Sequence, residues 1–390
     1  MNKKISLIFA IGLAAAAAFG VASCGHNPAS PNSIGTPTST GTPTSTGIPT
    51  STFTPTATPA NGGVVTTLAG QLSSGSTNAT GTSASFYYPS GVAVNSAGTT
   101  IYVADNSNNM IRAVSSGGVV STLAGQLTGG FNNATGTAAQ FSSPAGVAVN
   151  SAGTTIYVAD YGNNMIRAIT TGGVVSTFAG QIVNGHGNAT GTSASFYNPN
   201  GVAVDSSGNV YVADSSNNLI RKITTGGVVS TLAGQLTGGS TNATGTAASF
   251  NHPTGVAVDG SGNVYVADEG NNMIREITSG GVVSTLAGQL TSGHNNATGT
   301  AASFFDPWGV AVDAYGNVYV AELGNSLIRF ITPAGVVSTL AGSGSPTFGN
   351  GTGTGASFNE PTGVAVYSQG GALDVAYVAD EYNFMIREIH

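Results

Sequence analysis

Short apolar runs separated by turn-forming residues recur from residue 62 to the C-terminus. In the unit that begins at Gly201 the runs read Gly-Val-Ala-Val, Val-Tyr-Val-Ala, Leu-Ile-Arg-Lys-Ile and Val-Val-Ser-Thr-Leu-Ala. These runs are too short for ordinary helices, and the Ser-Ser-Gly-Asn and Thr-Thr-Gly-Gly segments between them are typical of hairpin turns. Each unit is therefore predicted to form four strands. Because the runs are continuously apolar, both faces of each small sheet should be buried.

The four-run unit occurs six times, which decides the expected architecture. Successive Tyr-Val-Ala-Asp or Tyr-Val-Ala-Glu boxes are 55, 54, 54, 54 and 58 residues apart, starting at Tyr102, Tyr157, Tyr211, Tyr265, Tyr319 and Tyr377. Four-stranded sheets that pack face to face in a ring form a β-propeller. The repeat therefore predicts an all-β fold, a six-bladed β-propeller of four-stranded blades.

The two ends of the repeat region are incomplete in complementary ways. The region opens with a fourth-strand run, Gly63 to Gly70, and closes with a third-strand run, Ile386 to Ile389, that no fourth run follows. We expect the N-terminal strand to complete the last blade and so close the ring.

The N-terminal segment has the features of an export signal. Lys3 and Lys4 precede an apolar run from Ile5 to Phe19, and small residues then lead to Cys24, the only cysteine in the chain. This arrangement resembles a bacterial lipobox, in which the thiol is diacylated; an ordinary signal peptide with a chance cysteine is the alternative. The expected organisation is a lipoprotein signal peptide (1–23), a disordered Ser/Thr/Pro-rich tether (24–61) and the propeller (62–390). The expected location is the bacterial cell envelope, with the protein held on the membrane by its N-terminal lipid and facing the periplasm or the exterior.

Charged residues are scarce and follow the repeat. Only 6% of residues are charged, against about 25% in ordinary domains, and the net charge is −7. The chain has no cluster of Lys and Arg, so we expect no nucleic-acid partner. An acid recurs seven positions before an arginine in every unit, as Asp268 does before Arg275. Six copies of one pair indicate scaffolding through charge-assisted hydrogen bonds rather than one reactive centre.

Two further periodic features are interpreted as structural. The Asn-Ala-Thr triplets should support turns in the long loops rather than carry glycans; they begin at Asn78, Asn133, Asn188, Asn242 and Asn296. The aspartates after Gly-Val-Ala-Val should cap the hairpin turns that follow them; they are Asp205, Asp259 and Asp313.

The composite Phe-x-x-Pro-x-Gly-Val-Ala-Val…Gly-Asn-Val-Tyr-Val-Ala-Asp…Asn-x-x-Ile-Arg resembles the NHL repeat family, most clearly at 196–221 and 250–275. The resemblance implies a binding platform, and related six-bladed propellers include calcium lactonases and zinc amidating lyases. RNA-binding NHL propellers present a basic face, which this chain lacks. Metal-dependent relatives carry His or carboxylate ligands around the channel, where this chain has Gly-Val-Ala-Val. We therefore predict no cofactor and no metal ligands.

The positions that vary between otherwise similar units are the candidate binding residues. They lie just before and within the Pro-x-Gly segment, in the long link to the first strand, and should surround the channel mouth. The candidates are Tyr87, Tyr88, Tyr197, Asn200, His252, Phe305, Asp306, Trp308 and Glu360. Aromatic side chains mixed with polar ones suit a protein, peptide or saccharide ligand, although they could also pack the loops onto the blades. The predicted function is a binding or interaction module; the alternative is a lactonase- or lyase-type enzyme with a metal-dependent site at the channel mouth.

Overall fold

The computed structural model of the chain describes residues 62–368 and 374–390. The predicted signal peptide, the tether and Cys24 lie outside the described residues, so the lipid anchor stays a prediction. In the part of the chain that is described, no helix is long and apolar enough to cross a bilayer.

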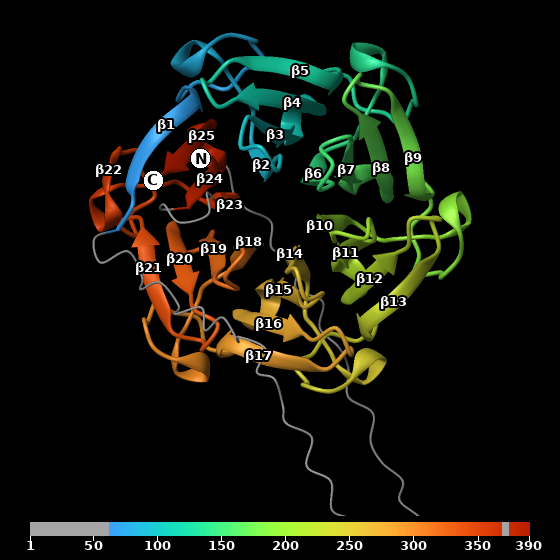
Figure 1. The fold of residues 1–390 in the computed structure, drawn as a ribbon, viewed down its shortest axis with the longest axis vertical. Helices are drawn as coiled ribbons and strands as arrows, with labels where there is room; N and C mark the ends of the chain where they lie inside the picture. Colours follow the sequence, from blue (N-terminus) through green and yellow to red (C-terminus); the bar gives the residue numbers. More distant parts are fainter. Residues whose placement is uncertain (1–61, 369–373) are drawn as a thin grey trace, which may run out of the picture. The chain divides into compact units, whose positions relative to one another are not determined.

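Six small antiparallel sheets surround a central axis (Figure 1), which confirms the predicted six-bladed propeller. The first blade contains β2 (Pro89–Val94), β3 (Thr100–Asp105), β4 (Met110–Ser115) and β5 (Val120–Gly125), and the second β6 (Pro144–Val149), β7 (Thr155–Asp160), β8 (Met165–Thr170) and β9 (Val175–Gly180). The third contains β10 (Pro199–Val204), β11 (Val210–Asp214), β12 (Leu219–Ile223) and β13 (Val229–Gly234), and the fourth β14 (Pro253–Val258), β15 (Val264–Asp268), β16 (Met273–Ile277) and β17 (Val283–Gly288). The fifth contains β18 (Pro307–Val312), β19 (Val318–Glu322), β20 (Leu327–Ile331) and β21 (Val337–Ala341).

The last blade joins both ends of the propeller, as predicted from the incomplete repeats. Its sheet order is β22 (Gly351–Thr352), β1 (Val64–Gly70), β25 (Met385–Ile389), β24 (Val375–Asp380) and β23 (Pro361–Tyr367). β1 runs antiparallel to β25, with Val65 opposite Ile389 and Gly70 opposite Met385. In Figure 1 the first strand lies beside the last one. The short fifth strand β22 was not predicted; it pairs with the outer edge of β1.

Single-turn 3₁₀ helices occupy two places in the repeat. One set lies in the long loops between blades: η1 (Gly81–Ser83), η3 (Gly136–Ala138), η5 (Gly191–Ser193), η7 (Gly245–Ala247), η9 (Gly299–Ala301) and η10 (Gly353–Gly355). The other follows the second strand of a blade: η2 (Asn106–Asn108), η4 (Tyr161–Asn163), η6 (Ser215–Asn217), η8 (Glu269–Asn271) and η11 (Glu381–Asn383). The turn of the second set brings the second-to-third-strand link to the same face as the Pro-x-Gly segment, because Tyr382 donates its backbone N–H to the carbonyl of Asn359.

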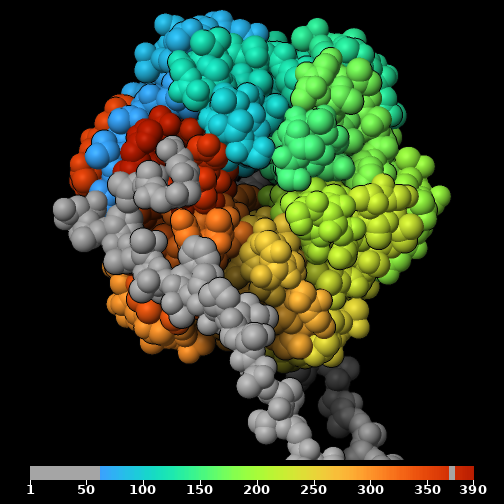
Figure 2. All heavy atoms as spheres, in the orientation of Figure 1, coloured from blue at the N-terminus to red at the C-terminus, as the bar shows by residue number. Residues whose placement is uncertain are grey.

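The hydrophobic core lies between blades, so both faces of each sheet are covered. One cluster joins Ala159 and Ile166 of the second blade to Phe196, Val202 and Ile223 of the third. Equivalent clusters fill the other five interfaces. The continuous apolar runs are thus explained by packing on two sides, and Figure 2 shows the blades packed around a central hollow.

The glycine of each Pro-x-Gly segment permits the inner strands to approach closely. A Cβ on Gly201 would collide with the carbonyl oxygen of Thr254 in the next blade, and a Cβ on Gly363 with that of Ser90. The same contact recurs at all six interfaces around the ring. Glycine is therefore required here by backbone packing rather than by ligand chemistry.

The recurring acid–arginine pairs are buried salt bridges within the blades, in keeping with the predicted scaffold role. Arg275 Nη1 lies 2.7 Å from Asp268 Oδ2, and both side chains are fully buried. Arg275 Nη2 donates to Asn242 Oδ1 at 2.6 Å, and its guanidinium stacks on the Phe250 ring at 5.2 Å. The asparagine of the Asn-Ala-Thr triplet therefore ties the long loop to the blade. The aspartate after the first strand caps the hairpin, since Asp205 Oδ1 accepts from the backbone N–H of Ser207 and Asn209.

Candidate functional site

The six inner strands line a central channel with a hollow at each end. The Val-Ala-Val segments surround one hollow. The x-Gly-Val segments surround the other, which we call the channel mouth. Neither lining contains a carboxylate, an imidazole or a thiol. Within residues 62–368 and 374–390, no group of three or more His, Cys, Asp or Glu side chains is placed to hold a metal ion.

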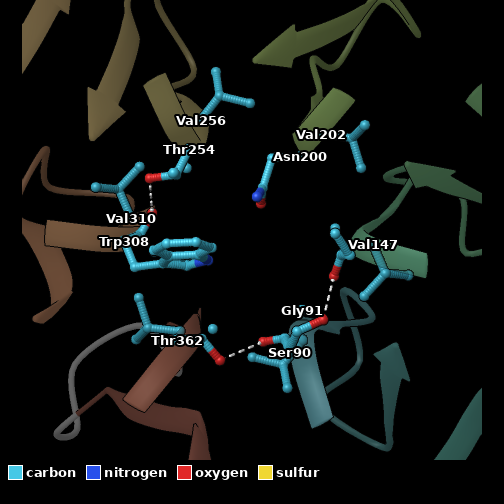
Figure 3. A pocket seen from close by; sticks show the side chains of 18 residues that line it. Ser90, Gly91, Val147, Asn200, Val202, Thr254, Val256, Trp308, Val310 and Thr362 are labelled. Atoms are coloured by element: carbon cyan, nitrogen blue, oxygen red, sulfur yellow. Dashed lines mark hydrogen bonds between the residues drawn. The ribbon is translucent and has the colours of Figure 1, made fainter. Parts of the chain in front are cut away.

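Three of the six variable side chains at the channel mouth join neighbouring blades. The Thr254 hydroxyl donates to the Trp308 carbonyl at 2.8 Å, and the Ser90 hydroxyl to the Ala145 carbonyl at 2.9 Å. The Thr362 hydroxyl donates to the Ser90 carbonyl at 3.2 Å across the ring closure. Figure 3 shows these bonds running around the mouth from blade to blade. These hydroxyls are already used by the scaffold.

Ala145, Asn200 and Trp308 make no such bond, and of these three only Asn200 and Trp308 have polar side-chain atoms. Asn200 is only 8% exposed as a whole residue, but its amide is open to the channel mouth and makes no hydrogen bond to a described residue. Trp308, the single tryptophan of the chain, is half-buried, and its indole extends from β18 toward the centre of the ring. In Figure 3 both side chains point into the same space. The Asn200 amide is therefore free to hydrogen-bond a ligand at the mouth.

The rim residue before each proline has a left-handed backbone. Its φ lies between 48° and 54° at Tyr88, Ser143, Asn198, His252, Asp306 and Glu360. At four of these positions the backbone N–H donates to an asparagine side chain of the preceding blade, as His252 does to Asn218 Oδ1 at 2.8 Å. At the other two positions, Glu360 and Tyr88, the preceding blade has Ser326 and Phe384 in place of the asparagine. The seams on both sides of the last blade therefore depart from the repeat.

Three predicted rim residues meet at the seam between the last and first blades. The Tyr87 and Tyr88 rings stack 4.8 Å apart, and Tyr88 lies 4.8 Å from Tyr382 and 5.3 Å from Phe384 between ring centroids. Glu360 lies near enough for its negative charge to raise the pKa of the Tyr88 and Tyr382 hydroxyls. Tyr382, Phe384 and Glu381 were missed by the sequence interpretation, which considered only the segment around Pro-x-Gly.

A comparison of equivalent positions could have revealed these missed residues. The position of Tyr382 holds Ser107, Gly162, Ser216, Gly270 and Gly324 in the other blades, and that of Phe384 holds Asn109, Asn164, Asn218, Asn272 and Ser326. Large aromatic residues thus replace small or polar ones only in the last blade.

The remaining predicted residues lie elsewhere on the rim. His252 Nδ1 is 3.3 Å from Glu269 Oε2, and burial together with Glu269 raises the pKa of Asp306. Tyr197 and Phe305 are about two-fifths exposed. None of these four residues lines the channel mouth.

Burial also affects the Glu381 carboxyl at this seam. It raises the pKa of the Glu381 carboxyl from 4.5 to about 7, with Glu360 adding to the rise and the nearby Thr362 hydroxyl opposing it. The seam therefore holds a carboxyl group that changes charge near neutral pH.

Comparison with known proteins agrees with the fold. The NHL repeat family model matches residues 196–223 and 250–276, in the third and fourth blades. A model described as "Lactonase, 7-bladed beta-propeller" matches residues 50–182, although this ring has six blades. Protein SUPPRESSOR OF QUENCHING 1, chloroplastic, of Arabidopsis thaliana is 29% identical over 269 residues. That match covers 64% of this chain but only 25% of the plant protein's length.

Solved propellers are similar in fold at low sequence identity. An auxiliary nutrient binding protein from Bacteroides thetaiotaomicron has a TM-score of 0.62 at 17% identity, covering 85% of this chain and 76% of that one. A protein of unknown function from the same species has a TM-score of 0.64 at 20% identity, covering 84% and 76%. A gluconolactonase from Xanthomonas campestris has a TM-score of 0.54 at 12% identity, covering 83% and 88%. At these identities the likeness concerns the fold alone.

Proposed function

Because this chain is an NHL-type six-bladed β-propeller, we propose that it acts as an exported, lipid-anchored binding module that holds a protein, peptide or saccharide at its channel mouth. The amide of Asn200, which makes no hydrogen bond to a described residue and faces the same hollow as Trp308, carries this proposal.

The chemistry of the mouth suits such a ligand. A carboxamide provides two donors and an acceptor, and an indole provides a broad apolar face and one N–H donor. Saccharide hydroxyls and peptide amides are complementary to both. The surrounding wall of Gly-Val segments carries no charged side chain, so it suits an uncharged part of a ligand.

The repeat indicates that neither residue is needed for folding. Ala145 occupies the position of Asn200 in the second blade, and Thr254 and Thr362 occupy that of Trp308. Asn200→Ala and Trp308→Thr therefore replace each residue by one that the same scaffold already accepts.

The experiment begins with glycan and peptide arrays and continues with the probes retained. Selective tryptophan excitation reports on Trp308 alone, because the chain has one tryptophan. A probe bound at the mouth should change this fluorescence. Asn200→Ala and Trp308→Thr should each weaken its binding by about 2 kcal/mol, measured by calorimetry, at an unchanged melting temperature.

Ser207→Ala, in a hairpin at the other end of the blade, is the control and should bind as the wild type does. If both mouth variants bind normally, the channel mouth is not the binding site. The alternative enzyme is favoured if the wild-type protein hydrolyses lactones and a chelator abolishes the activity.

A further inference from the structure

The seam between the last and first blades carries an aromatic surface separate from the channel mouth. We define the aromatic seam as Tyr87, Tyr88, Tyr382 and Phe384. Tyr87 precedes β2, whereas Tyr382 and Phe384 follow β24, so the surface exists only because the ring closes. Tyr87 is 38% exposed and Tyr382 is 41% exposed, so the cluster is open to solvent.

The fold does not require these aromatic residues. Phe384 has φ of 57°, a left-handed conformation that is unfavourable for a bulky side chain and readily adopted by asparagine. Asparagine at the equivalent position in four blades also bonds the backbone of the next blade. The last blade therefore carries strain and lacks a bridge where the repeat offers an unstrained residue. Strain of this kind is commonly retained for function.

Within residues 62–368 and 374–390, the acids beside the aromatic seam have no basic partner. Among the ion pairs of the described residues, none involves Glu360 or Glu381. All six arginines are fully buried against their own acids, and Lys222 lies over the Tyr211 ring in the third blade. The propeller therefore places aromatic rings and two uncompensated carboxyl groups together.

We propose that the aromatic seam is a second binding site, which holds a lysine or arginine side chain of a basic peptide segment against the tyrosine rings and the two glutamates. Aromatic faces attract cations through their quadrupole, and the carboxylates add a negative charge that no described basic residue pairs with. The site goes beyond the proposed function, because it involves neither Asn200 nor Trp308.

The pH dependence of binding provides a specific signature of this site. Glu381 has a pKa of about 7, and the groups around it are Glu360, Thr362, Tyr88 and Tyr382. A cation binds the ionised form, so affinity for a lysine peptide should rise as the pH rises through about 7. Glu381→Gln should remove this rise.

The test measures fluorescence anisotropy of a labelled oligolysine peptide with the full chain. Oligoglutamate and a neutral glycine–serine peptide of the same length are the comparison probes. Tyr382→Ser and Glu381→Gln should each weaken oligolysine binding about fivefold or more. Binding should also weaken with added salt.

Phe384→Asn separates binding from folding. This variant restores the residue of four other blades, so its melting temperature should rise while its affinity for oligolysine falls. A change in both quantities in the same direction would contradict a functional role for the strained aromatic residue.

The outcomes for the two sites are distinguishable. Oligolysine binding that is weakened by the seam variants but not by Trp308→Thr supports the aromatic seam, whatever the channel mouth binds. Absence of oligolysine binding, binding unaffected by the seam variants, or seam-dependent binding of a neutral saccharide instead overturns the proposal. Failure of Asn200→Ala and Trp308→Thr to affect any retained probe would overturn the proposed function alone.

Discussion

The arginine of each unit makes several buried hydrogen bonds that join its blade to the long loop. Arg275 bonds Asp268, the carbonyl oxygens of Ser249 and Thr241, and Asn242. Its Nε is buried with no hydrogen-bond partner among the described residues, so the guanidinium leaves one donor group unpaired. A buried ion pair is weak evidence of net stabilisation, but removal of one partner is costly because a charge is left buried and unpaired.

Arg275→Met should therefore lower the free energy of unfolding by about 3–5 kcal/mol near neutral pH, as measured by denaturant titration. Burial already raises the pKa of Asp268 from 3.8 to about 6 in the folded protein, and loss of Arg275 should raise it further. A carboxyl group whose pKa is higher in the folded state favours folding most at low pH, and this contribution is lost as the pH rises through the folded pKa. The deficit of the variant should thus shrink as the pH falls from the raised pKa of Asp268 in the variant to about 6, the pKa of Asp268 in the wild type, and should change little below that.

The control is Arg275→Met combined with Asp268→Asn, which removes the unpaired charge. The double variant should be more stable than the single one at neutral pH and should lose the acid dependence. Equal stability of the two variants at every pH would contradict the claim that Arg275 stabilises the fold by pairing the buried Asp268 carboxylate.

Among the strands, β1 has a role that no other strand shares. It supplies the outer partner of β25 and the inner partner of β22, and thus joins the N-terminal part of the propeller to the last blade. Val65 of β1 lies in the cluster between the fifth and last blades, and Leu68 and Ala69 lie in the cluster between the last and first blades. The strand therefore contributes to two interfaces as well as to one sheet.

Removal of residues 1–70 should expose the edge of β25 and open both interfaces. An exposed strand edge invites pairing with another chain, so the truncated protein should associate in size-exclusion chromatography and melt at a lower temperature. A chain that begins at residue 61 is the matched control and should behave as the intact propeller does. A monomeric truncation with an unchanged melting temperature would show that β1 does not close the ring.

Across the whole propeller, the arginines are buried with six of the acids, whereas the other acids have no such partner. Six of the sixteen carboxyl groups lie in the buried arginine pairs, which leaves ten with no lysine or arginine partner in the described residues. The surface is consequently acidic, which favours cationic partners and disfavours nucleic acid. The excess of negative charge behind the net charge of −7 is carried by these other acids, because the six arginines are buried in their own pairs.

The predicted lipid anchor also concerns the whole molecule, and the prediction rests on Cys24 alone. Cys24→Ser should abolish lipidation, because the chain has no other thiol. The variant should accumulate as an uncleaved or soluble precursor and leave the detergent phase in a Triton partition experiment. A variant that partitions as the wild type does would contradict the lipobox interpretation.

The sequence by itself determined the blades. Strand positions, blade number and ring closure follow from local apolar runs and turns, and six repetitions make each local signal unambiguous. The scaffold role of Asp268 and Arg275 followed from the same repetition. The short strand β22 lacked any such signal, because it is two residues long and depends on pairing with β1.

Only the tertiary structure decided which rim residues act together. The sequence placed nine variable residues around one mouth, whereas the fold separates Asn200 and Trp308 from Tyr87, Tyr88 and Glu360. Phe384 and Tyr88 come from opposite ends of the propeller and meet because β1 closes the ring. Periodicity specifies which residues occupy equivalent positions, but side-chain proximity depends on blade packing, and ring closure brings the two chain ends into contact.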